Sequence, residues 1–286
     1  MEIAVISGKG GTGKSSITSA FIALAGQVVA VDCDVDASNL YLLLNPEKAG
    51  EEKFISGYHA RINQNQCYQC GKCVTYCKFD ALGWDGGSVT INEVACEGCF
   101  LCSRVCPAQA INMIPSNDSR LYWGDFRYGK MVYGRLAPGE ENSGKLINKL
   151  RTKARETAKA YNLETIILDG PPGISCPVIS TITGVDKVVI VTEPTISGMS
   201  DLQRTVELVR KFDVGVYIIV NKYDLNTEIS GDIDLWCAGQ SLQVIGHFPF
   251  DKSMVDAMIA GESIIEYSSN AEISKLINVA YMKIIT

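Results

Sequence analysis

The feature that most constrains the fold is a glycine-rich loop that follows a short apolar strand near the N-terminus. Residues 2–6 (EIAVI) predict the strand, and the pattern G-x-x-x-x-G-K-S runs from Gly8 to Ser15. A helical stretch, SITSAFIALAG, overlaps its end. Strand, loop and helix in this order form a phosphate cradle, because the glycines let backbone N–H groups turn inward and the helix N-terminus adds its positive dipole. A chance match in a glycine-rich turn would lack this context.

The loop also supplies specific ligands. We expect Lys14 to neutralise the β- and γ-phosphates and the hydroxyl of Ser15 to bind Mg²⁺. The residues expected to contact the nucleotide along the loop are Gly8, Gly10, Gly11, Thr12, Gly13, Lys14, Ser15 and Ser16.

An early lysine, Lys9, turns the loop into K-G-G-x-G-K-S. This form resembles the deviant Walker A motif of the superfamily of MinD, ParA, Mrp and the nitrogenase iron protein. In that superfamily the early lysine crosses a nucleotide-sandwich dimer to reach the partner's phosphates. The resemblance implies an ATP-dependent homodimer in which Lys9 takes part in catalysis.

Acidic residues follow two further predicted strands. The strand QVVAVD ends at Asp32, with Asp34 two residues later, and the strand ETIILDGPPG contains Asp169. The resemblance implies that Asp34 positions the attacking water, that Asp32 lies near the Mg²⁺ shell, and that Asp169 holds a Mg²⁺-bound water. A solvated loop is the alternative for the acids that begin at Asp32.

The base is expected to lie at the ends of the last two strands. VGVYIIVNKYD carries Asn221 and Asp224, and QVIGHFPFD carries Pro249 and Phe250. An N-K-x-D string reads guanine in GTPases, whereas the resemblance assigns Asn221 to adenine and the loop at Pro249 and Phe250 to covering the base. We therefore expect ATP and ADP as ligands.

The alternation of strands with helices of 10–15 residues predicts an α/β fold with a doubly wound, mostly parallel sheet. The resemblance covers about residues 1–50 and 140–286. We expect an ATPase domain made of residues 1–56 and 116–286, interrupted by an inserted domain at 57–115. The insert is expected to be a small α+β module.

Eight of the eleven cysteines form two runs of the pattern C-x2-C-x2-C-x3-C inside the insert. Each cysteine of the first run has a counterpart 29 residues later, which indicates an internal duplication. The pattern resembles the bacterial two-cluster ferredoxin, in which the fourth cysteine of each run ligates the other cluster. Zinc, the alternative, prefers two separated C-x2-C pairs that close one tetrahedral site.

The resemblance implies two [4Fe–4S] clusters with exchanged fourth ligands. One would take Cys67, Cys70, Cys73 and Cys106, and the other Cys96, Cys99, Cys102 and Cys77. Lys78 stands where the family has proline, and we expect its charge to raise the potential of the second cluster slightly. The clusters either conduct single electrons or simply staple a small fold, and the presence of two favours conduction.

Three other segments carry expectations. Residues 116–143 predict an aromatic hairpin beside the insert, and the helix after it is expected to start near Asn142 and Ser143. Residues 271–285 predict a helix that docks on the sheet rather than on a membrane.

Three cysteines lie outside the runs. Cys33 is expected to point into the sheet and Cys237 into the core. Cys176 follows the segment that resembles switch II, at a spacing similar to a cluster ligand of the nitrogenase iron protein. No second cysteine per chain accompanies it, which favours a packed or interfacial thiol over a metal ligand.

Charge and hydropathy limit the function classes. The net charge of −6 argues against broad binding to nucleic acid or anionic membrane. Neither a signal peptide nor an apolar run long enough to span a bilayer is evident, so we expect a soluble cytoplasmic protein without stable membrane insertion. The expected function is ATP-gated electron transfer to a redox partner. An ATPase that delivers a cluster or metal to a client protein is the alternative, and a MinD-like spatial regulator fits less well because it needs no electron path.

Overall fold

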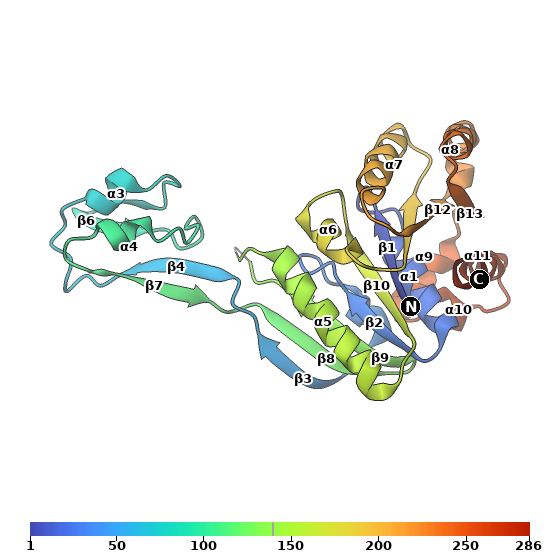
Figure 1. Cartoon of the computed structure of the whole chain (residues 1–286), viewed down its shortest axis with the longest axis horizontal. Helices are drawn as coiled ribbons and strands as arrows, with labels where there is room; N and C mark the ends of the chain where they lie inside the picture. Colours follow the sequence, from blue (N-terminus) through green and yellow to red (C-terminus); the bar gives the residue numbers. More distant parts are fainter. Residues whose placement is uncertain (139) are drawn as a thin grey trace. The chain divides into compact units, whose positions relative to one another are not determined.

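The computed structural model describes residues 1–138 and 140–286, which divide into two compact units (Figure 1). The first unit comprises Met1–Glu51, Leu121–Gly134 and Gly144–Thr286. The second comprises Glu52–Arg120 and Arg135–Ser143. The predicted insert at 57–115 therefore lies inside the second unit, which also takes in a short segment from the far side of the hairpin.

A large, mostly parallel sheet organises the fold, as the sequence predicts. Its strand order is β13-β12-β11-β1-β10-β2-β9-β8-β3. The strands are β1 (Glu2–Ser7), β2 (Val28–Asp32), β3 (Glu47–Lys53), β8 (Arg120–Phe126), β9 (Gly129–Arg135), β10 (Thr165–Pro172), β11 (Lys187–Thr192), β12 (Gly215–Asn221) and β13 (Gln243–Phe248). The central strands are near-continuous apolar runs, which is typical of parallel strands covered on both faces.

The strand register brings the predicted acidic residues together. In the parallel pair of β10 and β2, Asp169 is the register partner of Asp32. On its other side β10 pairs with β1, whose chain continues directly into the glycine-rich loop. Since parallel strands end at one edge of the sheet, the loop and both carboxylates meet there.

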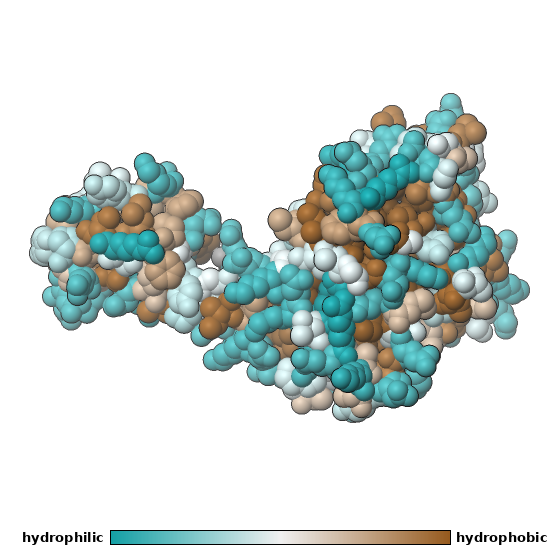
Figure 2. All heavy atoms as spheres, viewed as in Figure 1, coloured by the Kyte–Doolittle hydropathy of each residue, from teal (hydrophilic) through white to brown (hydrophobic). Residues whose placement is uncertain are grey.

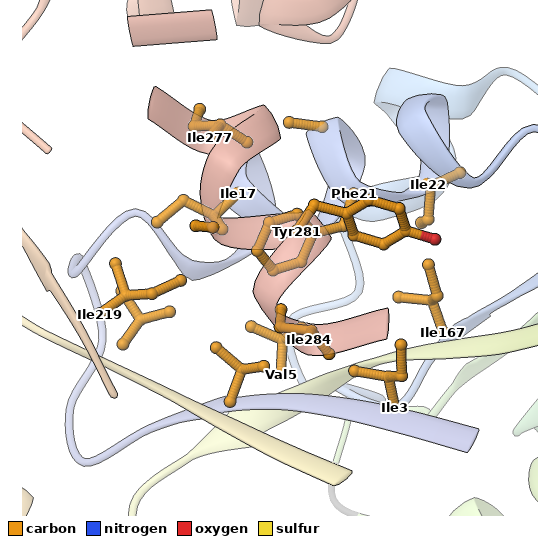
Figure 3. Packing of buried hydrophobic residues seen from close by; sticks show 14 of the residues in the cluster. Ile3, Val5, Ile17, Phe21, Ile22, Ile167, Ile219, Ile277, Tyr281 and Ile284 are labelled. Carbon is orange, nitrogen blue, oxygen red and sulfur yellow. The ribbon is translucent and has the colours of Figure 1, made fainter. Parts of the chain in front are cut away.

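Helices cover the sheet and close the core. They are α1 (Lys14–Ala25), α2 (Leu40–Leu44), α5 (Ser143–Tyr161), α6 (Cys176–Ile182), α7 (Ile196–Val209), α8 (Thr227–Gly239), α9 (Lys252–Ala260), α10 (Ile264–Tyr267) and α11 (Glu272–Ile285), with a 3-10 turn at Tyr223–Leu225. Figure 3 shows Phe21 of α1 beside Tyr281 of α11, with their ring centroids 5.5 Å apart, above Val5 of β1. The predicted docking of the C-terminal helix is confirmed, because its apolar face is buried in this core.

The hairpin predicted within residues 116–143 is present. β8 and β9 are joined by Arg127 and Tyr128, and β9 pairs in parallel with β2, so the hairpin extends the large sheet. The reason lies in β9 itself, where Met131 and Val132 are both fully buried, which requires cover on both faces. The helix that follows, α5, begins at Ser143 as expected.

The second unit preserves the sequence duplication in three dimensions. It contains β4 (Gly57–Ile62) paired antiparallel with β7 (Ile111–Ser116), and β5 (Leu82–Asp85) paired antiparallel with β6 (Ser88–Ile91). Its helices α3 (Lys72–Tyr76) and α4 (Leu101–Val105) start 29 residues apart. The buried core consists of three pairs at the same spacing: Ala60 and Val89, Cys73 and Cys102, Leu82 and Ile111.

The small core leaves apolar groups at the surface of this unit. Figure 2 shows apolar side chains exposed there, and Tyr68 and Trp84 are among the exposed aromatic residues. Such a unit depends on a further stabilising element, because so few buried side chains cannot offset the entropy of folding. Among the described residues, no helix has the length and apolar character needed to cross a bilayer.

Candidate nucleotide site and cysteine cavities

The loop between β1 and α1 is shaped by close approaches that only glycine allows. Gly13 has a φ of 87°, and a Cβ there would lie 2.4 Å from the side-chain nitrogen of Asn221. A Cβ on Gly8 would lie 2.5 Å from the Cβ of Asp201. Gly11 also has a positive φ, of 81°. These features suit a loop whose backbone N–H groups wrap around an anion.

This loop forms one wall of a cavity of about 370 Å³, a size that suits a small-molecule ligand. The loop at Phe250 and helix α9 also line the cavity. The predicted nucleotide residues that line the cavity are Gly10, Gly11, Thr12, Gly13, Lys14, Ser15, Ser16, Asp34, Asn221, Pro249 and Phe250. The lining does not include Gly8, Lys9, Asp32, Asp169 or Asp224.

Lys14 forms a buried ion pair with Asp169. The distance from Lys14 Nζ to Asp169 Oδ1 is 2.7 Å, and the two side chains are 7% and 0% exposed. Thr18 donates its hydroxyl to the same oxygen at 2.9 Å. The other oxygen, Oδ2, is buried without a hydrogen-bond partner among the described residues. An unpaired buried carboxylate oxygen suits a water of a Mg²⁺ shell, since such groups are normally satisfied.

Asp32 is buried beside Asp169 and is held by its own loop. Its Oδ2 accepts hydrogen bonds from the Ser38 hydroxyl at 2.8 Å and from the N–H of Leu40 at 3.0 Å. Burial, reinforced by the charge of Asp169, raises the pKa of Asp32 to about 7. Two adjacent buried carboxylates repel each other, and a divalent cation would relieve that repulsion. The donor set therefore fits Mg²⁺ together with the hydroxyl of Ser15.

Asp34 lines the cavity, as does Asp251, the N-cap residue of α9. Asp34 is half-buried, and burial raises its pKa, although the charge of Lys14 opposes that shift. A carboxylate in this position can accept a hydrogen bond from a water molecule in the cavity. The geometry thus permits the role in water positioning that the sequence assigns to Asp34, and that role stays a prediction.

Lys9 is held within its own chain. Its Nζ lies 2.7 Å from Glu193 Oε1 and 3.0 Å from the hydroxyl of Thr195, the N-cap residue of α7. Glu193 also pairs with Lys222 at 3.2 Å, and Lys222 donates to the carbonyl of Gly11 at 2.9 Å. Although burial opposes it, hydrogen bonds from both lysines lower the pKa of Glu193. Sequence reasoning missed Glu193 and Lys222, although each follows a buried strand at the functional edge of the sheet.

Residues of the N-K-x-D string hold two loops of the site in place through hydrogen bonds. The side-chain amide of Asn221 donates to the carbonyl of Thr12 at 2.7 Å, and Asp224 Oδ1 accepts from the N–H of Phe250 at 2.6 Å. These contacts fix the glycine-rich loop and the loop at Phe250 to the same strand end. Contact of Asn221 with adenine stays a prediction.

The eight cysteines of the runs line two separate cavities in the second unit. One cavity, which we call the first cavity, is lined by Cys67, Cys70, Cys73 and Cys106. The second cavity is lined by Cys77, Cys96, Cys99 and Cys102. Each cavity thus receives three cysteines from one run and the last cysteine of the other run. The structure brings these residues together in the two groups that the resemblance implies.

The chemistry of both cavities fits a cubane. Backbone N–H groups point at sulfur in each, from Ala110 to Cys106 Sγ at 3.3 Å and from Ala60 to Cys96 Sγ at 3.4 Å. Burial raises the pKa of Cys102 to about 11, so this thiol needs a bound cation to become a thiolate. In the described part of the chain, no three residues of the types His, Cys, Asp and Glu are arranged to hold a single metal ion. The four thiolates of a cubane bind four different irons and stand further apart.

The other cysteines fall outside these groups. Cys33 and Cys237 are fully buried, as predicted, and burial raises the pKa of both thiols, that of Cys237 to about 11. Cys176 is exposed at the first turn of α6, so it is not packed within its own chain. Its interfacial role stays a prediction.

Comparisons with known proteins agree with the geometry of the first unit. A family model described as the CobQ/CobB/MinD/ParA nucleotide binding domain matches residues 3–264. An uncharacterized protein of Methanocaldococcus jannaschii is 35% identical over 289 residues, covering 99% of this chain and 96% of that protein. The cell division ATPase MinD of Pyrococcus furiosus has a similar structure, with a TM-score of 0.60 at 15% identity, over 100% of this chain and 98% of that one.

Other relatives are similar at lower coverage or identity. An iron-sulfur cluster carrier protein of Pyrococcus abyssi is 22% identical over 98% of this chain and 84% of that protein. The pyruvate synthase subunit PorD of Thermotoga maritima is 38% identical over 58 residues, which are 20% of this chain and 59% of that protein. The family match and the phosphate-binding loop show that the chain belongs to the CobQ/CobB/MinD/ParA nucleotide-binding family and is an ATPase.

Proposed function

We propose that this ATPase is a homodimer in which the bound nucleotide controls the passage of single electrons through two [4Fe–4S] clusters in the second unit. The observation that carries the proposal is the grouping of the cysteines. Two cavities, each lined by four cysteines drawn from both runs, belong to a chain whose other unit holds a phosphate-binding loop. One cluster would suffice to staple a small fold, whereas two provide a route for electrons.

The residues of the first unit account for hydrolysis. Lys14 would turn from Asp169 to the β- and γ-phosphates, and the hydroxyl of Ser15 would bind Mg²⁺. Asp34 orients a water molecule in line with the γ-phosphorus, whose bond to the bridging oxygen breaks as the bond to water forms. The proton of the water passes to the released phosphate or to solvent.

The charges around the loop explain why turnover by a single chain would be slow. Lys9 is paired with Glu193 of its own chain, and Lys14 is paired with Asp169. We propose that Lys9 leaves Glu193 and reaches the partner's phosphates when two chains close over two nucleotides. Hydrolysis then depends on dimer formation, and the dimer forms only when ATP is bound. The presence of the dimer therefore reports the nucleotide state.

The residues of the second unit would hold the clusters. Cys67, Cys70, Cys73 and Cys106 would bind one cluster, and Cys77, Cys96, Cys99 and Cys102 the other. When bound, the clusters supply sites that accept and release one electron each. Cys70 and Cys99 are exposed, so each cavity has an edge that a redox partner protein could approach.

A second function is favoured by one comparison. The similarity to an iron-sulfur cluster carrier protein extends over 98% of this chain, which supports an ATPase that hands a cluster or metal to a client protein. The two functions differ in what leaves the protein. A carrier releases iron and sulfide, whereas an electron conductor keeps its clusters and releases electrons only.

Both outcomes can be followed in one experiment. The chain is reconstituted anaerobically with iron and sulfide and reduced, and electron delivery to a viologen dye is measured with ATP, ADP and a non-hydrolysable ATP analogue. We expect delivery to depend on the nucleotide, and Cys67→Ser or Cys96→Ser to abolish it while ATP hydrolysis continues. Nucleotide-independent delivery, combined with transfer of iron to an apo-ferredoxin, would instead support the carrier function.

A further inference from the structure

The two cysteine cavities differ in the charges around them. Among the described residues, the lining of the first cavity includes Lys72 and no carboxylate, whereas that of the second includes Glu97 and no cation. A neighbouring hollow on the Cys96 side is lined by Glu97, Glu140 and Glu141. We call these three carboxylates the acidic rim.

Glu140 is held in place as an anion. It belongs to the segment Arg135–Ser143, which joins the second unit from outside the cysteine runs. Its carboxylate accepts hydrogen bonds from the Ser56 hydroxyl at 2.8 Å and from the N–H groups of Asp118 at 2.9 Å and Ser119 at 3.1 Å. Burial opposes ionisation, but hydrogen bonds from the Ser119 side chain and its neighbours lower the pKa of Glu140. The negative charge is therefore fixed beside the second cavity.

The two cavities do not differ in the described hydrogen bonds from backbone N–H groups to cysteine sulfur. In each cavity a backbone N–H donates to a cysteine sulfur, from Ala110 in the first and from Ala60 in the second, at nearly equal distances of 3.3 and 3.4 Å. Such bonds stabilise an added electron to a similar extent on both sides. We therefore attribute a difference in reduction potential between the two sites to the surrounding charges. Nearby anions disfavour an added electron, and nearby cations favour it.

We propose that the acidic rim makes the second cavity the lower-potential electron site, so that an electron shared by the module rests at the first cavity, beside Lys72. This inference rests on the proposed ligation of two clusters. It reverses the order that Lys78 suggests from the sequence. Lys78 is exposed and is absent from the described lining of both cavities, whereas Glu97 lines the second directly.

The test is a potentiometric titration of the anaerobically reconstituted full chain, followed by electron paramagnetic resonance, which yields two midpoint potentials. Glu97→Gln and Glu141→Gln should each raise the lower potential, and Lys72→Gln should lower the higher one. Each substitution should narrow the difference between the two midpoint potentials. The ratio of electron occupancy at the two sites should then change by about threefold to tenfold. A tenfold shift corresponds to 59 mV for a one-electron couple. Raising the salt concentration should narrow the gap as well.

Glu207→Gln, an exposed carboxylate change in the first unit, is the matched control and should leave both potentials unchanged. A single midpoint for both sites, or a Glu97→Gln variant that raises the higher potential and widens the gap, would overturn the inference. An iron content well below about eight per chain would contradict the proposed function itself. Full iron content with the wrong order of potentials contradicts the inference alone.

Discussion

Lys14 Nζ lies 2.7 Å from Asp169 Oδ1 in a site where neither side chain is appreciably exposed. The lysine that we expect to bind phosphate is thus neutralised by the carboxylate that we expect to support the magnesium shell. Nucleotide and Mg²⁺ together can replace this pair, because phosphate takes the ammonium and the cation takes the carboxylate. The site therefore has two states. In one, Lys14 pairs with Asp169, and in the other, Lys14 contacts phosphate while Asp169 faces the magnesium shell.

Lys14→Ala should abolish nucleotide binding and also destabilise the protein without nucleotide. The substitution leaves Asp169 as an unpaired buried charge, which costs about 3–5 kcal/mol. Urea unfolding and calorimetric titration with ATP check both effects. The double variant Lys14→Ala with Asp169→Asn should recover most of the stability but none of the binding. Equal stability of the single variant and the unaltered protein would contradict the importance of the pair.

Lys9→Ala should separate nucleotide binding from dimer formation. Lys9 contacts Glu193 and Thr195 but does not line the nucleotide cavity, so ATP should still bind. We expect the variant to remain a monomer with a non-hydrolysable ATP analogue and to lose at least about tenfold of its ATPase rate. Light scattering and phosphate release measure the two effects, with the exposed Lys211→Ala as control. Normal dimerisation and hydrolysis by Lys9→Ala would refute the assigned role.

Asp32 gives the nucleotide-free protein an unusual dependence on pH. Its pKa rises to about 7 in the folded state, from near 3.9 in the unfolded chain. Between these values the folded state binds more protons, so this group makes stability fall as pH rises from about 4 to about 7. Unfolding in urea at pH 5 and pH 7.5 measures the effect, and Asp32→Asn should weaken it. With saturating ATP and Mg²⁺ the unaltered protein should lose much of this dependence, because the cation favours the ionised carboxylate.

The grouping of the cysteines predicts which substitutions share a phenotype. Cys106→Ser should remove the same cluster signal as Cys67→Ser, although these residues belong to different runs. Cys77→Ser should remove the other signal, together with Cys96→Ser. Iron analysis should give about four irons per chain for each variant, and paramagnetic resonance identifies which signal remains. Loss of one common signal by Cys67→Ser and Cys77→Ser would contradict the exchanged ligation.

Much of the first unit could be predicted because its signals are local. The apolar strands, the loop from Gly8 to Ser15 and the acids at the strand ends each follow from a few neighbouring residues. The pairing of Asp32 with Asp169 also follows, since consecutive βα units place their strand ends at one edge. The internal repeat of 29 residues likewise predicts that Cys73 and Cys102 occupy equivalent positions in the core of the second unit.

The omissions concern contacts between residues distant in sequence. Alternation predicts the hairpin of β8 and β9, but the pairing of β9 with β2 joins segments far apart in the chain and has no local signature. The pair of Lys9 with Glu193 spans much of the first unit and has no local signature. Glu140 reaches the Cys96 side of the second unit from beyond the hairpin, which no pattern in the cysteine runs reveals.

The most direct test of nucleotide gating is a potentiometric titration of both clusters with and without a non-hydrolysable ATP analogue. If the nucleotide state controls the electron path, at least one midpoint potential should shift by more than about 30 mV, which is about 0.7 kcal/mol for one electron. The Lys14→Ala variant, which cannot bind the analogue, should show no shift. Unchanged potentials in the unaltered protein, together with transfer of its iron to an apo-protein, would contradict gating and leave cluster delivery as the function.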